Sequence, residues 1–270
     1  MSALKTSARL WQYSRQGDGL RDACLAFLCS GLGVIGRHRV GLRRLFFKAI
    51  GWFAQADQVC LRLNLPERII AVRMRRGNEA DYLVAGELVV GGYPLPAGEY
   101  TAPTAIVDGG ANIGVFTLQA AARFPDVPVS CYEPEKANLE QLRLNLATNG
   151  VEAEIVPKAM WSKTEELFFH PGLSYTGLVN KEPSPFPIAC ELPRVPAGCW
   201  LKLDIEGAEY EVLPALLKGG AKPAIVSMEI HDFNQRGQGL LDLLRQFGYS
   251  IHGSFKPDAP CVTICACRQE

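Results

Sequence analysis

Three acidic residues that follow apolar runs are the side chains best suited to form a binding site. Asp108 ends the run "AIVD", Glu133 ends "VSCYE" and Asp204 ends "WLKLD". Short apolar runs of this kind predict strands. Ligands of parallel α/β sheets bind outside the carboxyl ends of the strands. The three carboxylates are therefore predicted to meet at one ligand site.

The segment that starts at Asp108 reads "DGGANIG" and has almost no side chains. Its glycines allow a tight turn and a close approach of the backbone to a ligand, and Asn112 tolerates a left-handed conformation. Glu133 lies 19 residues beyond Gly114 (133 − 114), and an acid at about this distance can accept hydrogen bonds from both ribose hydroxyls. Asp108 would repel a pyrophosphate but suits an amino-bearing cation. S-adenosylmethionine, with a ribose, an amino group, a sulfonium and no phosphate, therefore fits better than NAD.

The elements that must position these acids alternate along the chain after Thr104. Strand-like and helix-like segments follow one another, which predicts an α/β fold with a doubly wound, mostly parallel sheet. The last two strand-like runs, "YSIH" and "CVTICACR", have no helix between them and predict an antiparallel C-terminal edge strand. We place an N-terminal helical basic extension at residues 1–66 and the main domain, with a short β lead-in, at residues 67–270.

Three motifs together resemble the FkbM family of S-adenosylmethionine-dependent methyltransferases. They are "IVDGGANIGVFTL", "YEPEKANLEQLRLN" and "LKLDIEGAEYEVL", and the resemblance covers roughly Ala105 to His231. It implies the seven-stranded, Rossmann-like fold of class I methyltransferases. It also implies that Glu133 and Pro134 hold the ribose, and that Ala159 and Met160 flank the adenine. The residues implied to line the methionine and ribose are Asp108, Gly109, Gly110, Ala111, Asn112 and Gly114, with Asp204 beside them.

Two positions depart from the family pattern. Gly109 stands where the family commonly has a branched residue, which predicts a looser turn. The run "KAMW" after the third strand has no acid or amide for the adenine amino group, so the adenine contacts are the least determined part of the site.

A hydroxyl acceptor needs a group that takes its proton. The candidates at the predicted strand ends are His231, Asp204 and Glu206, and His231 is the first choice because an unperturbed histidine titrates near neutrality. We expect no metal at the site. The alternative is a divalent ion held by Asp204 with Glu229 or His231. A further histidine, His170, lies in a Pro-rich insert that could cover the acceptor.

These features predict an S-adenosylmethionine-dependent methyltransferase that methylates a hydroxyl of a sugar, a glycan or a secondary metabolite. Two alternatives stay open: an RNA or other nucleic-acid methyltransferase, and a non-catalytic protein that binds S-adenosylmethionine. Against the first, no RNA-binding module is visible, and the Asn/Asp–Pro–Pro–aromatic tetrad of amino-group methylation is missing. Against the second, Asp108, Glu133 and Asp204 are all in place.

The first third of the chain is basic. Residues 1–80 hold 14 basic and 5 acidic side chains, a net charge of +9, although the whole chain is neutral. The segment "GLRRLFFKAIGWF" predicts a helix with a basic face (Arg43, Arg44, Lys48) and an apolar one. We favour packing of this helix on the catalytic domain over peripheral contact with an anionic membrane. The apolar face is predicted to hold Leu42, Leu45, Phe46, Ala49, Ile50 and Phe53.

Composition and cysteine usage favour a cytoplasmic protein. The longest uncharged run in the N-terminal part, residues 23–36, is too short for a membrane-spanning helix, which needs about 18 or more residues. No convincing signal peptide is present. The nine cysteines show no zinc-type CxxC spacing and are expected to be reduced thiols.

Overall fold

The computed structural model describes residues 15–34, 40–93, 95, 102–171, 177–253 and 256–269. The chain forms two compact units. The first comprises Met1–Gly92, Ile113–Pro125 and Glu140–Val151, and the second comprises Tyr93–Asn112, Asp126–Leu139 and Glu152–Glu270.

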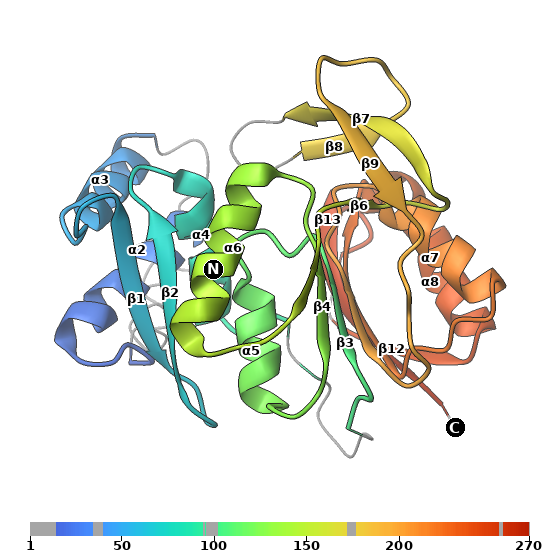
Figure 1. The fold of residues 1–270 in the computed structure, drawn as a ribbon, viewed down its shortest axis with the longest axis horizontal. Coiled ribbons are helices and arrows are strands. Elements are labelled where there is room, and N and C mark those ends of the chain that lie inside the picture. The colour runs from blue at the N-terminus through green and yellow to red at the C-terminus, as the bar shows by residue number, and fades with distance from the viewer. Residues whose placement is uncertain are drawn as a thin grey trace. The chain divides into compact units, whose positions relative to one another are not determined.

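The second unit is built on a sheet of seven strands, which confirms the predicted fold (Figure 1). The strand order is β12-β13-β11-β10-β3-β4-β5, and the pairs β11–β10, β10–β3, β3–β4 and β4–β5 are parallel. The order reverses between β3 and β10, which is the switch point where ligands bind in doubly wound sheets. The strands are β3 (Ile106–Gly109), β4 (Val129–Tyr132), β5 (Glu154–Val156), β10 (Trp200–Leu203), β11 (Ile225–His231), β12 (Tyr249–His252) and β13 (Cys261–Arg268).

The C-terminal strand is antiparallel as predicted, but it is not the edge. Strand β13 pairs antiparallel with β11 on one side and with β12 on the other, so β12 forms the edge. The physical reason is burial: Val262, Ile264 and Ala266 of β13 are buried, and an inner position covers such a strand on both sides. The sheet is thus doubly wound and mostly parallel, with one antiparallel strand inserted beside β11.

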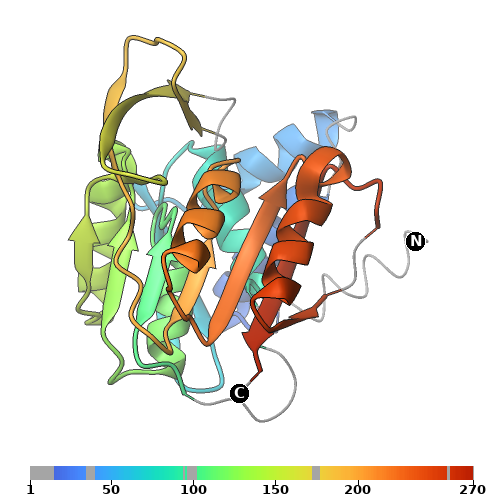
Figure 2. The same cartoon turned by 90° about the vertical axis from the view of Figure 1, so that its right-hand side faces the viewer.

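Two helices of this unit cover one face of the sheet. Helix α7 spans Glu209–Lys218 and α8 spans Gln238–Gln246, the latter after a π-helical turn at Phe233–Gly237. Their leucines, including Leu213, Leu216 and Leu241, pack with the buried side chains of β10, β11 and β13 in one core. Figure 2 shows these helices in orange and red, lying across the strands. They fix the ends of β10 and β11, where Asp204 and His231 lie.

The Pro-rich insert contains strands. A second sheet of order β6-β9-β7-β8 is formed by Ala159–Met160 (β6), Glu165–Pro171 (β7), Gly177–Asn180 (β8) and Pro187–Glu191 (β9). Figure 1 shows β7, β8 and β9 of this sheet in yellow to gold. His170 lies in β7, where its Nε2 is 2.9 Å from the Glu182 carbonyl oxygen.

The first unit joins the N-terminal elements to two later helices. Helix α2 (Leu20–Val34) contacts α4 (Glu79–Val89), and β1 (Gln58–Asn64) pairs antiparallel with β2 (Ile69–Arg75). The unit also contains α5 (Val115–Arg123) and most of α6 (Lys136–Asn149). The backbone of β2 is tied to α6: Asn145 accepts from the Arg73 amide at 2.7 Å, and Asn149 accepts from the Ala71 amide at 2.8 Å.

The boundary predicted between residues 66 and 67 falls inside this unit. It would separate β1 from β2, which are paired over seven residues. The cause is that the β lead-in belongs to the N-terminal part, together with the helices on which it packs.

The basic helix is α3 (Val40–Gly51). It packs within the first unit, since Ile50 is fully buried and Phe46 and Phe47 are partly buried, and its packing on the catalytic domain stays a prediction. The predicted apolar face is only partly correct, because Leu42 and Leu45 are 40% and 56% exposed. Among the described residues, no helix is long and apolar enough to span a membrane.

Candidate functional site

Asp108, at the end of β3, is fully buried and has an internal partner. The Lys202 Nζ, which is also buried, lies 3.2 Å from Asp108 Oδ1 and donates to the Gly110 carbonyl oxygen at 2.7 Å. The expected contact of Asp108 with an amino-bearing ligand remains a prediction. In this geometry the acid and Lys202 together hold the start of the turn. Lys202 was not among the predicted site residues, although a lysine inside the apolar run "WLKL" was a visible signal.

The glycine turn is fixed to both neighbouring strands. The amides of Gly110 and Ala111 each donate to the Tyr132 carbonyl oxygen of β4 at 3.0 Å, and the Asp204 amide donates to the Gly109 carbonyl oxygen at 3.2 Å. Gly110 has φ +72°, and a Cβ there would overlap the carbonyl oxygen of Asp204. The turn therefore brings the ends of β3, β4 and β10 together, as predicted. Ala111 is buried.

Gly114 belongs to the first unit and ends the turn there. Its φ is +88°, it precedes α5, and a Cβ would lie 2.6 Å from the Leu142 Cδ1. Glycine is therefore required at position 114 by the backbone conformation and by the close approach of α6. The predicted contact of Gly114 with a cofactor stays a prediction.

Glu133 is buried and bound to the turn. Its Oε2 accepts from the Asn112 amide at 2.8 Å, and its Oε1 accepts from the Glu135 amide at 2.9 Å. Burial raises the pKa of Glu133 to about 7, although these two bonds lower it. Pro134 follows at the strand end and is half-buried.

These residues fit the ribose end of S-adenosylmethionine. A carboxylate has about four acceptor positions, so Glu133 keeps capacity for hydroxyl donors beside its two amide bonds. Among the residues that the structure describes, the buried Oδ1 of Asn112 has no hydrogen-bond partner, and a bound ligand would supply one. The space that a Cβ at Gly110 would occupy is kept free of side chains.

The predicted adenine residues, Ala159 and Met160, are both buried in β6. Met160 explains the departure at Gly109. A Cβ at Gly109 would lie 2.6 Å from the Met160 Sδ, so the methionine fills the space that a branched residue would need. The contact of these residues with adenine remains a prediction.

Acidic side chains gather at the carboxyl ends of β10 and β11. We call Asp204, Glu206, Glu209, Glu229 and His231 the acidic cluster. Asp204 accepts from the Tyr93 hydroxyl at 2.9 Å and lies 3.8 Å from the Lys202 Nζ. Since Asp204 also contacts the glycine turn through its backbone, the acidic cluster adjoins the predicted cofactor site.

His231 is held between two carboxylates. Its Nε2 lies 3.1 Å from Glu206 Oε2, and its Nδ1 lies 3.3 Å from Glu209 Oε1. Burial alone would lower the pKa of His231, but the hydrogen bonds and charges of Glu206 and Glu209 outweigh it and raise the pKa to about 11. At neutral pH the ring is a cation with both nitrogens donating. This geometry argues against the prediction that His231 takes the proton of an acceptor.

Glu229 was considered in the sequence only as a metal ligand. It lies two residues before His231 in β11, and its Oε1 accepts from the Cys261 thiol at 2.9 Å. Burial and the nearby charge of Asp204 raise the pKa of Glu229 to about 7. A carboxylate with a pKa near the working pH has the property that general-base catalysis requires.

The acidic cluster also offers ligand atoms for a cation. Ligand atoms of Asp204, Glu206 and His231 lie within 4.8 Å of one another, and so do those of Glu229, His231 and Cys261. The expectation of a site without metal and its divalent-ion alternative therefore both remain open to experiment.

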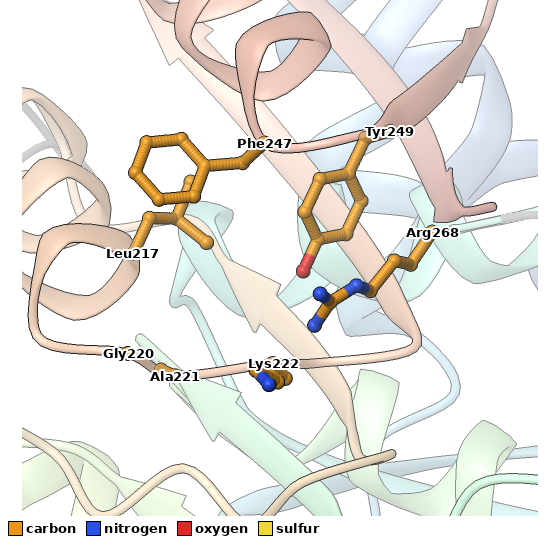
Figure 3. A pocket seen from close by; sticks show the side chains of 7 residues that line it. All are labelled: Leu217, Gly220, Ala221, Lys222, Phe247, Tyr249 and Arg268. Atoms are coloured by element: carbon orange, nitrogen blue, oxygen red, sulfur yellow. The ribbon is translucent and has the colours of Figure 1, made fainter. Parts of the chain in front are cut away.

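A cavity of about 90 Å³ lies beside the amino end of β11, at the opposite end of that strand from His231. Figure 3 shows Tyr249 and Arg268 pointing toward the loop at Lys222, which precedes β11. His231 lies at the carboxyl end of β11, about 20 Å from Ile225 at the amino end, at about 3.3 Å per residue. Because of this distance, the cavity is not part of the candidate site. It is also smaller than pockets for drug-sized ligands, which measure about 300–1,000 Å³.

We expect Glu133→Ala to weaken binding of S-adenosylhomocysteine by about 10- to 100-fold, because charge-assisted hydrogen bonds contribute about 1.5–3 kcal/mol. Binding by the unaltered chain should strengthen as pH rises through about 7, where Glu133 ionises. In Glu133→Gln this pH dependence should disappear. Calorimetric titration between pH 6 and pH 8 measures both effects. Glu152→Gln, at an exposed glutamate of the same unit, is the control. Unchanged affinity in Glu133→Ala would remove Glu133 from the ribose role.

The same raised pKa has a defined effect on the ligand-free protein. Between the ordinary pKa of 4.5 and about 7, the folded chain keeps a proton on Glu133 that the unfolded chain has released. The contribution of Glu133 to the free energy of unfolding is therefore largest at low pH and falls as pH rises through about 7.

Comparison with known proteins finds one family match and several similar solved structures. Residues 195–251 match the family model "Methyltransferase FkbM domain", a range that includes the whole acidic cluster. No curated protein matches the chain. Two of the similar solved structures are methyltransferases. A precorrin-6y C5,15-methyltransferase from Geobacter metallireducens has 13% identity and a TM-score of 0.40, covering 62% of this chain and 81% of its own.

The second is a Pyrococcus abyssi tRNA (uracil-54, C5)-methyltransferase in complex with S-adenosyl-L-homocysteine. It has 14% identity and a TM-score of 0.40, and the match covers 77% of this chain and 43% of that one. These likenesses are too distant to indicate an acceptor. Residues 195–251 are similar to the FkbM methyltransferase domain, and this match supports S-adenosylmethionine as the cofactor of the site.

Proposed function

We propose that the enzyme methylates a hydroxyl oxygen of a sugar, a glycan or a secondary metabolite. The observation that carries this proposal is the acidic cluster at the carboxyl ends of β10 and β11, which adjoins the glycine turn through the contact between Asp204 and Gly109. A neutral hydroxyl must lose its proton as it is methylated, and a nearby carboxylate can take that proton.

When bound, S-adenosylmethionine supplies an electrophilic methyl carbon attached to a sulfonium. The chain's part is to align the acceptor oxygen with that carbon and to receive the proton. Glu133 holds the ribose and so fixes the position of the sulfonium relative to β3 and β10. The acceptor hydroxyl lies over the ends of β10 and β11, where the carboxylates are.

We assign the proton to Glu229. Its pKa of about 7 makes it a better base than Asp204, which is bonded to Tyr93, or Glu206, which is paired with His231. The cationic His231 lowers the pKa of Glu229. It keeps that carboxylate partly ionised at neutral pH despite the burial, which makes His231 a positioning residue. The roles of Asp204 and Glu206 are then to orient Tyr93 and His231.

The same cluster disfavours a nucleic-acid acceptor. A nucleic acid would bring its phosphates close to four carboxylates, whereas nucleic-acid sites are lined by basic residues. After β10 the chain reads Asp-Ile-Glu-Gly in place of the tetrad that binds an amino group for methylation.

The test is transfer of an isotope-labelled methyl group from S-adenosylmethionine to fractions of a cell extract. We expect label in the carbohydrate or small-molecule fraction, as a methyl ether in the mass spectrum of the product. Label in RNA would replace this proposal with the nucleic-acid alternative. Binding of S-adenosylhomocysteine without transfer to any fraction would indicate a non-catalytic protein. Parallel assays with EDTA, and with EDTA followed by excess Mg²⁺, decide whether a divalent ion is part of the site.

A further inference from the structure

Helix α3 has one face that packs within the first unit. Ile50 is fully buried. The Phe46 ring lies 5.9 Å from that of Phe27 in α2, and the Phe47 ring lies 5.6 Å from that of Tyr82 in α4. These contacts fix the rotation of α3 about its axis and so determine which residues it turns to solvent.

The opposite face is apolar and basic together. Leu42 and Leu45 are exposed at 40% and 56%, and Trp52, directly after the helix, is exposed at 80%. Arg44 and Lys48 are exposed on the same side, since residues three and four apart share a helix face. We call Leu42, Arg44, Leu45, Lys48 and Trp52 the α3 surface. Exposed apolar side chains that adjoin one another mark interaction sites. The exposed leucines and tryptophan therefore indicate that this face has a partner.

We propose that the α3 surface docks on an anionic lipid bilayer. Helices that lie in the membrane interface have tryptophan and leucine beside lysine and arginine, because the rings and alkyl groups enter the headgroup region while the charges meet lipid phosphates. Trp52 at the end of the helix fits the interfacial preference of tryptophan. The net charge of +9 over residues 1–80 attracts the whole segment to a negative surface.

The charges on this surface favour lipid over a protein partner. Lysine is depleted in the centres of protein interfaces, yet Lys48 lies between Leu45 and Trp52. A symmetric dimer through the same surface would bring Arg44 and Lys48 near their own copies, which is repulsive. Lipid phosphates instead complement both side chains.

The experiment is co-sedimentation of the full chain with vesicles of phosphatidylcholine and phosphatidylglycerol, compared with phosphatidylcholine alone. We expect binding to the anionic vesicles only, and weaker binding at high salt. The double variant Arg44→Glu, Lys48→Glu should lower the partition coefficient by at least about 25-fold, because each basic residue near the surface contributes about a fivefold factor and the new negative charges are repelled. Leu45→Ser with Trp52→Ser should lower it by a similar factor.

Matched controls separate this surface from general charge and hydrophobicity. Lys218→Glu with Lys222→Glu makes the same change of charge at exposed lysines of the second unit, and Ile69→Ser removes an apolar side chain that is 52% exposed on β2. Both should bind as the unaltered chain does. Far-UV circular dichroism and thermal unfolding confirm that each variant is folded.

The fluorescence of Trp52 gives an independent readout. Anionic vesicles should shift tryptophan emission to the blue in the unaltered chain, and Trp52→Phe should abolish that shift. Three results would overturn the proposal: no binding to anionic vesicles, equal binding by the charge-reversed and control variants, or a dimer in solution that Leu45→Ser with Trp52→Ser dissociates. The last result would assign the surface to contact between copies of the chain.

Discussion

Replacing Glu229 with glutamine should lower kcat by about 10²–10⁴-fold, the usual contribution of a general base. Glutamine has nearly the same shape and can keep the contact with Cys261, but it cannot receive a proton. Binding of S-adenosylhomocysteine should change little, because Glu229 lies in β11 and the predicted cofactor residues lie in or after β3, β4, β6 and β10. The measurement is steady-state kinetics on the acceptor found by labelling, with the cofactor affinity determined separately by calorimetry.

The pH profile distinguishes Glu229 from His231. In the unaltered enzyme, kcat/KM should rise with pH through about 7 as Glu229 loses its proton. His231→Ala removes the positive charge that lowers the pKa of Glu229, so the rise should move to higher pH and the rate should recover there. If His231 were the base, its alanine variant would lose activity at every pH and Glu229→Gln would keep most of it.

Much of the fold follows from local patterns in the sequence. The parallel strands β3, β4 and β10 are short apolar runs that end at a glycine turn or an acid, and period and composition predict such runs well. For the same reason Asp108, Glu133 and Asp204 could be placed at strand ends. The position of β13 between β11 and β12 could not be predicted, because strand order depends on which edges bury Val262 and Ile264, and that is a property of the whole sheet.

The chemistry of the acidic cluster depends on neighbours that are distant in sequence. His231 has an ordinary pKa in isolation, and it becomes a cation only because Glu206 and Glu209 of another segment meet both ring nitrogens. Glu229 resembles a misplaced acid in an apolar strand until Cys261 from β13 and Asp204 from β10 are beside it. Sequence could indicate that charges gather here, but not which of them holds a proton.

Helix α3 shows a related limit. The helical period grouped Leu42 and Leu45 with Phe46 and Ile50 on one apolar face, whereas the structure buries Ile50 and exposes both leucines. The aromatic contacts with α2 and α4 rotate the helix away from the position at which its apolar residues would be best covered. A hydrophobic pattern predicts that a helix is amphipathic, and its packing partners decide which apolar residues remain outside.

Gly110→Ala should lower the free energy of unfolding by about 3–5 kcal/mol, the upper range for a single substitution. Two effects add at this position. Its φ of +72° is unfavourable for alanine, and the new Cβ would overlap the carbonyl oxygen of Asp204. A backbone carbonyl held by β10 cannot move as a side chain can, so the ends of β3 and β10 must separate. Because these ends also position Asp204 and the turn beside Glu133, affinity for S-adenosylhomocysteine should fall at least about tenfold in any variant that folds.

Gly109→Ala is the matched control, one residue away on the same strand end. Gly109 has no positive φ, and the nearest atoms to its new Cβ are the Sδ and Cε of Met160, at 2.6 and 2.9 Å. A thioether side chain can rotate aside, so we expect a loss of only about 1–2 kcal/mol from overpacking. Adding Met160→Ala should remove that clash, so the double variant should be more stable than the sum of the single losses predicts. Met160→Ala should leave the loss caused by Gly110→Ala unchanged. Urea unfolding of the three single and two double variants measures each term, and equal losses for Gly109→Ala and Gly110→Ala would show that the contact between the turn and Asp204 is not rigid.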